Sequence, residues 1–260
     1  MTLAYDTGLR LRSLPPGLRS ELEEAAYNHG YRRQTGEADG WFFFASDINV
    51  PGEIGLAVAQ GGSAWFLTVG HAGVATELNG PPAQPVPQGM RAAYGFTSGS
   101  EVRQALHRAY ALACSLPTLP LYEFQEQIAG LGGTEAERLV KRRVGQEVFR
   151  RALDRYWDSR CPLTGISDRQ MLRGSHILPW ADCSSDAERL DVHNGLLLSA
   201  HWDAAFDAGL VSFSDDGVPL LKEELSAEAC TILRADAAPS IPLSIEHNRY
   251  LHCHRKRFGF

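Results

Sequence analysis

The fold of this chain is decided by Ser175-His-Ile-Leu-Pro-Trp180, His193-Asn-Gly-Leu-Leu-Leu198 and His201-Trp-Asp-Ala-Ala-Phe-Asp-Ala-Gly209. Short apolar runs at 175–178 and 195–198 predict two strands, and the polar residues 181–193 predict a loop between them. Residues 200–207 predict a helix that directly follows the second strand. A β-hairpin followed by a helix is therefore expected in this stretch.

This hairpin and helix would bring together residue types that can hydrolyse a phosphodiester. His176 lies in the first strand, and Asn194-Gly195 is a turn dipeptide whose amide can pin one strand to the other. Asp203 and Asp207 are four residues apart, so they lie on the same face of the helix. Hydrolysis needs a base, which neutral imidazole supplies at pH 7, and a cation, for which carboxylates are hard oxygen ligands.

Further motifs surround these residues at ordered positions: Gln146-x-x-Phe149-Arg150, Cys161-x-x-Thr-Gly165, Ser-His176-Ile-x-Pro-Trp180, Asn194-Gly-Leu-x-Leu198, Phe206-Asp-x-Gly209 and Tyr250-Leu-x-x-His254-Arg255. With them, about residues 143–258 resemble the HNH endonuclease family, the ββα-metal nuclease domain of bacterial restriction-like endonucleases. The order and spacing of several motifs make the resemblance specific, where a single His and Asn would not.

The resemblance implies roles at matching positions. His176 would be the general base, and Asn194 would fix the loop and orient the histidine. Asp203 lies three residues before Phe206, where the family's third motif residue binds the metal. Ser175 departs from the pattern, because many relatives carry an Asp or His ligand there. The ion would then be held by Asp203, with Asp207 as a second ligand, and oxygen ligands favour Mg²⁺ or Mn²⁺ over zinc.

Other polar residues are expected to support the site or to contact DNA. Arg150 lies in a run of basic residues at 138–155 and could bind phosphate or pair with a buried acid. Arg255, in the basic tail, has the same two interpretations. We expect His201 to face DNA or to support the site rather than to bind metal.

The fold class expected for the whole chain is α+β. Residues 1–95 are expected to form an N-terminal domain of a helix and an antiparallel sheet, 96–142 a helical connector and 143–260 the nuclease domain. Helices are predicted at 17–30, 101–115, 121–131, 134–159 and 245–258, strands at 41–46, 54–59 and 64–69, a hairpin at 210–221, and a loop at 79–99. In the helix that starts at Thr134, Glu137 completes a capping box, and apolar residues from Leu139 to Tyr156 form one stripe.

Trp41 and Trp65 most simply belong to core strands of the N-terminal domain. A rarer alternative is a pocket that stacks on a flipped base, as in proteins that read modified DNA.

Composition limits the class of protein. The formal charge is −6, which argues mildly against a DNA binder, although a local basic face suffices for phosphate contact. The five Cys form no Cys-x-x-Cys pair, which favours a reduced, cytoplasmic protein. Apolar runs are too short to span a membrane, and Met1–Leu14 lacks the order of a signal peptide.

The resemblance therefore implies a metal-dependent DNA endonuclease with a bacterial restriction or defence role, in which the N-terminal domain selects plain or modified target DNA. Two alternatives remain open: a nuclease-derived DNA-binding module without catalysis, and a toxin-like nuclease controlled by a partner. A homodimer would make cleavage of both strands easiest.

Overall fold

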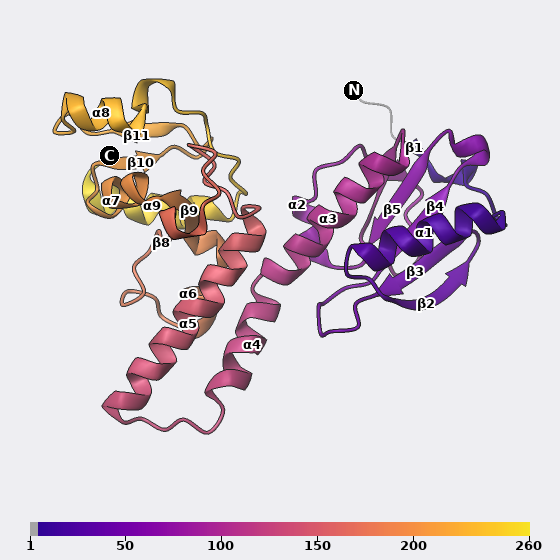
Figure 1. Cartoon of the computed structure of the whole chain (residues 1–260), viewed down its shortest axis with the longest axis horizontal. Coiled ribbons are helices and arrows are strands. Elements are labelled where there is room, and N and C mark those ends of the chain that lie inside the picture. Colours follow the sequence, from indigo (N-terminus) through magenta and orange to yellow (C-terminus); the bar gives the residue numbers. More distant parts are fainter. Residues whose placement is uncertain (1–4) are drawn as a thin grey trace. The chain divides into compact units, whose positions relative to one another are not determined.

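The structure is a computed structural model that describes residues 5–260, so residues 1–4 of the Met1–Leu14 segment lie outside it (Figure 1). The chain divides into two compact units, Met1–Cys114 and Ser115–Phe260, called here the N-terminal and C-terminal units. The division falls inside the expected connector, 96–142, whose residues are shared between the units. Helices and antiparallel sheets in both units confirm a mixed α+β fold. Within the described residues, no helix has both the length and the apolar character to cross a membrane.

The N-terminal unit is built on a five-stranded antiparallel sheet of order β2-β3-β4-β5-β7. The three predicted strands are confirmed as β3 (Trp41–Ala45), β4 (Ile54–Val58) and β5 (Trp65–Val69). The edge strand β2 (Arg33–Ala38) was not predicted, because all six of its residues are exposed and it shows no apolar alternation. The prediction of a loop at 79–99 is wrong at Ala92–Phe96, which form strand β7. Pairing with β5 stabilises this strand although Pro and Gly residues lie nearby.

Both faces of this sheet are buried. Helices α1 (Pro16–Asn28) and α3 (Gly99–Ser115) supply fully buried residues such as Leu22 and Leu106. Tyr5 and Ala83 pack in the cluster around Trp41 and Phe66. The remaining short elements of this unit are β1 (Tyr5–Asp6), η1 (Thr7–Leu9), η2 (Gln60–Gly62), α2 (Ala72–Glu77) and β6 (Ala83–Gln84).

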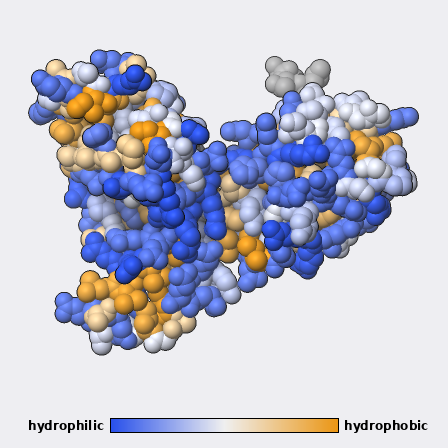
Figure 2. Space-filling view, in the orientation of Figure 1, coloured by the Kyte–Doolittle hydropathy of each residue, from blue (hydrophilic) through white to orange (hydrophobic). Residues whose placement is uncertain are grey.

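The C-terminal unit begins with α4 (Thr118–Ile128) and α5 (Glu135–Tyr156), and the capping box of Thr134 and Glu137 is present. The predicted apolar stripe of α5 is confirmed only in its second half, where residues such as Phe149 and Leu153 are buried. Leu139 and Val140 are 63% and 47% exposed, because the first turns of α5 extend past the strands. Figure 2 shows hydrophobic surface at this end of the helix pair.

The predicted hairpin and helix are present as β8 (Leu172–His176), β9 (Gly195–Ser199) and α7 (Ala200–Asp207). The strands are antiparallel, with His176 opposite Gly195. A side chain at Gly195 would place its Cβ 2.4 Å from the Phe149 ring, so glycine allows α5 to approach the hairpin. Contacts of α5 and α7 with both strands place one helix on each face of the hairpin.

The rest of the unit packs around this core. The second predicted hairpin is confirmed as β10 (Val211–Phe213) and β11 (Pro219–Leu221), and the basic tail forms α9 (His247–Phe258). The expected loop 181–193 contains the short helix α6 (Asp186–Arg189), and α8 (Ala227–Leu233) was not predicted. The remaining short turns are η3 (Arg169–Met171), η4 (Val192–Asn194) and η5 (Ala235–Ala237).

Candidate functional site

His176 is held between two aromatic rings at the end of β8. Its imidazole stacks on Phe149 with ring centroids 3.8 Å apart and meets the edge of Trp180 at 5.6 Å. Its Nε2 donates a hydrogen bond of 2.9 Å to the carbonyl oxygen of Arg189. Because that carbonyl can only accept, Nε2 carries the proton of the neutral ring and Nδ1 keeps the lone pair. Burial lowers the pKa of His176, and the bond to Arg189 offsets part of this shift.

Arg189 fixes the loop that supplies this carbonyl. Its guanidinium donates to the carbonyl oxygens of Trp180 at 3.2 Å and Cys183 at 2.8 Å, and to the carboxylate of Asp186 at 2.9 Å. Arg189 was not predicted from the sequence. The bond to His176 uses a backbone oxygen, and nothing in the sequence marks such an oxygen.

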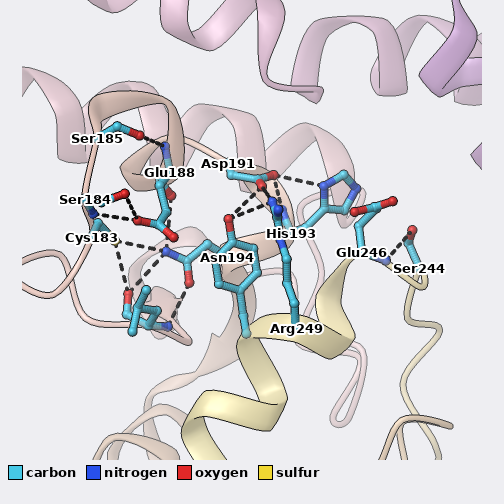
Figure 3. A network of polar contacts seen from close by, with 12 residues as sticks. Cys183, Ser184, Ser185, Glu188, Asp191, His193, Asn194, Ser244, Glu246 and Arg249 are labelled. Carbon is cyan, nitrogen blue, oxygen red and sulfur yellow. Dashed lines mark hydrogen bonds and ion pairs between the residues drawn. The ribbon is translucent and has the colours of Figure 1, made fainter.

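Asn194 is fully buried and holds the same loop from the other side (Figure 3). Its side-chain oxygen accepts from the backbone N–H of Leu178 at 2.7 Å. Its amide nitrogen lies 3.2 Å from the carbonyl oxygens of Leu178 and Glu188. Asn194 therefore acts on the geometry of the loop, and its amide faces the protein interior rather than solvent.

A buried carboxylate, Asp191, ties this region to α9 (Figure 3). It accepts from Arg249 at 2.6 Å, from the Tyr250 hydroxyl at 2.9 Å and from His193 Nδ1 at 2.9 Å. Burial raises the pKa of Asp191, but the interactions with His193 and the bond from Tyr250 outweigh it and lower the pKa to about 2. The loop and the C-terminal helix are thus joined through one ionised group.

The carboxylates of α7 meet β8 at Ser175, whose side chain points to the opposite face from that of His176, as for neighbouring strand residues. His176 is the last residue of the strand and still lines the same cavity as the carboxylates. The Ser175 hydroxyl donates a short hydrogen bond to Asp203. Desolvation raises the pKa of Asp207, and the negative charge of Asp203 raises it further. Both carboxylates line a cavity of about 360 Å³ at the edge of β8, together with Ser175, His176, His254 and Arg257.

The donors of this cavity fit a hydrated Mg²⁺ or Mn²⁺ ion. Asp203 and Asp207 supply hard oxygen atoms, and a bound cation would relieve the repulsion between their negative charges. Among residues 5–260, no group of three His, Cys, Asp or Glu side chains could hold a metal ion. Water and substrate oxygens would therefore complete the coordination, as Mg²⁺ commonly requires.

The other expected residues lie outside this cavity. Arg150 donates to Asp154 at 2.8 Å and to the Leu172 carbonyl at 2.8 Å, which supports the start of β8. Arg255 donates to the Phe213 carbonyl at 2.7 Å and to Asp215 at 2.6 Å, so both arginines are engaged within the protein. His201 is exposed on α7.

Trp41 and Trp65 are only 3% and 8% exposed in the sheet of the N-terminal unit. Their rings are therefore core residues, and the alternative of a base-stacking pocket does not fit their burial. A base could reach them only if the sheet opened.

Residues 161–214 match the model of the HNH endonuclease family. This segment is an HNH endonuclease domain. The match includes His176, Asn194 and Asp203 and confirms the resemblance predicted from the motifs. An HNH domain indicates a nuclease that acts on nucleic acid, and HNH nucleases typically use a divalent metal ion. No curated protein matches the chain.

Proposed function

We propose that the protein is a metal-dependent endonuclease that hydrolyses phosphodiester bonds of DNA. The observation that supports this most directly is the setting of His176. A neutral imidazole, fixed by Arg189 and Phe149, lies in the strand that lines the carboxylate cavity. That arrangement supplies the two requirements of the reaction in one cavity, a base from β8 and carboxylates for a cation from α7.

In this proposal, Nδ1 of His176 takes a proton from the attacking water. The resulting imidazolium stays bonded through Nε2 to the Arg189 carbonyl, which favours the charged ring. Ser175 orients Asp203, and Asp203 and Asp207 would hold the ion. Mg²⁺ or Mn²⁺, when bound, neutralises charge on the phosphate and the leaving oxygen. Asn194 keeps the loop of Arg189 in place, so it is a positioning residue.

We also propose a biological role for this activity. The resemblance to bacterial restriction-like endonucleases supports a cytoplasmic restriction or defence role, with cleavage that leaves 5′-phosphate and 3′-hydroxyl ends. The N-terminal unit would then select the target DNA, plain or modified, and a homodimer would cut both strands. A panel of plain and modified duplexes tests this part, because selection predicts that one class is cut preferentially.

One observation favours a second function, a DNA-binding module without catalysis. Ser175 stands where many relatives carry an acidic or histidine ligand, and its hydroxyl also engages Asp203. Fewer ligands would weaken the hold on the ion, while the run of basic residues at 138–155 could still contact phosphate.

A plasmid-nicking assay separates the two functions. The proposal predicts nicking with Mg²⁺ or Mn²⁺, none with EDTA, and a large loss in His176→Ala. The matched control is His252→Ala, an exposed histidine on α9 that lies outside the cavity. Binding without nicking under all metal conditions would establish the second function instead.

A further inference from the structure

A cationic side chain lines the carboxylate cavity. Arg257, in the last turn of α9, lines it together with Asp203 and Asp207. A phosphodiester that enters this cavity brings a negative charge next to two carboxylates. The guanidinium of Arg257 can offset that repulsion, and its planar fork matches the non-bridging oxygens of a phosphate.

Packing fixes the position of Arg257 relative to α7. Its neighbour His254 stacks on Phe206 with ring centroids 4.0 Å apart and donates to the Phe206 carbonyl at 3.1 Å. A Cβ at Gly209, two residues after the end of α7, would lie 2.1 Å from the Phe258 ring, so this glycine permits α9 to pack closely against the end of α7. The last turn of α9 is therefore held against the helix that carries both carboxylates.

In the structure, Arg257 is engaged by a different carboxylate. Its Nη1 lies 2.9 Å from Asp182, and the two side chains are 52% and 51% exposed. An ion pair this exposed contributes little to stability, because solvent and salt screen it. A phosphate can therefore displace Asp182 at low cost.

We propose that Arg257 binds the phosphate of the DNA strand in the cavity and that Asp182 is its resting counter-ion, which DNA displaces. This inference rests on the proposed function, because it names the group that receives the phosphate at the same site. It goes beyond that function in giving Asp182 a competing role. Removing Arg257 must weaken DNA binding, whereas neutralising Asp182 must strengthen it.

The opposite signs distinguish this inference from a structural ion pair. If the pair only held the loop of Asp182 to α9, Arg257→Ala and Asp182→Asn would change DNA binding in the same direction. Lys256→Ala is the matched control for the arginine, because it removes a positive charge from the adjacent residue, which does not line the cavity. Asp216→Asn, in the turn between β10 and β11, is the control for a lost negative charge.

The experiment measures binding of a short fluorescent duplex in EDTA over a range of salt concentrations, with folding checked by thermal melting. We expect Arg257→Ala to weaken binding about tenfold and to lower the salt dependence by about one counter-ion. Lys256→Ala should cost about twofold or less, and Asp182→Asn should tighten binding a few-fold relative to Asp216→Asn. The inference is overturned if Arg257→Ala matches Lys256→Ala, or if Asp182→Asn weakens binding.

Cleavage with Mg²⁺ under single-turnover conditions tells failure of this inference from failure of the proposed function. If the unmodified protein cuts and Arg257→Ala cuts as fast as Lys256→Ala, only the role of Arg257 is refuted. If the unmodified protein binds DNA but never cuts, the nuclease function fails, and the binding comparison still decides the role of Arg257.

Discussion

The two faces of strand β8 are built in opposite ways. On the face toward α5, His176 is stacked on Phe149, bonded to a backbone carbonyl and backed by a loop that Asn194 and Arg189 hold. On the face toward α7, Asp203 and Asp207 line a cavity, and the Ser175 hydroxyl donates a hydrogen bond to Asp203. The difference is that packing and hydrogen bonds fix His176, whereas the two carboxylates line a cavity in which, under the proposed function, a cation would bind.

Loss of the base should have the largest effect. In His176→Ala, no group remains on β8 to take the proton from water, so we expect cleavage to fall by about 10² to 10⁴-fold with DNA binding retained. Single-turnover cleavage measures the loss, and His252→Ala serves as the exposed control. Near-normal cleavage by His176→Ala would show that His176 is not the base, and the contrast between the two faces of β8 would then have no bearing on catalysis.

Substitutions of the carboxylates on the α7 face should raise the metal concentration that cleavage requires and leave His176 in place. Asp203→Asn should raise the Mg²⁺ concentration for half-maximal cleavage by about tenfold or more, and Asp207→Asn by less, because Ser175 orients only Asp203. Metal titrations of cleavage check both variants. If both variants and the unmodified protein need the same Mg²⁺ concentration for half-maximal cleavage, the carboxylates do not hold the ion.

Substitution of Arg189 tests whether the position of His176 depends on the loop that presents the Arg189 carbonyl. In Arg189→Ala the carbonyl remains, but the bonds to Trp180, Cys183 and Asp186 are lost, so His176 should become less ordered. We expect cleavage to fall about tenfold and the Nε2–H tautomer signal in NMR spectra to weaken, with partial rescue in Arg189→Lys. An unchanged tautomer and pH profile would assign Arg189 a purely structural role.

Asp191 should affect the stability of the fold rather than the cleavage step. Its pKa of about 2 in the folded protein lies below the unfolded value of about 3.9. Its ionisation therefore stabilises the fold fully above pH ~4, and this contribution is lost as the pH falls toward ~2. The loss is about 2–3 kcal/mol. Urea unfolding across this range should show a shallower pH dependence in Asp191→Asn, and equal slopes would contradict the assignment.

Much of the C-terminal unit could be predicted because its signals are local. The Thr134 capping box and the helix at 200–207 each depend on neighbouring residues, and both are present. The predicted Asn194-Gly195 turn is present only as a 3-10 turn that ends at Asn194, because Gly195 is already extended in β9. The prediction failed where partners are distant. Strand β2 is exposed throughout and is defined by its pairing with β3, and β7 lies among Pro and Gly residues but pairs with β5.

The sequence by itself determined which groups the chain has for chemistry: His176, Asn194, two aspartates on one helix face and the motifs that mark an HNH domain. Only the tertiary structure decided which partners each group meets. It engaged Arg150 and Arg255 within the protein and brought the Arg189 carbonyl to His176. It also placed Arg257, 50 residues after Asp207 in the sequence, in the same cavity as the carboxylates. The physical reason is that identity and local spacing are properties of the chain, whereas burial and hydrogen-bond partners depend on packing between distant segments.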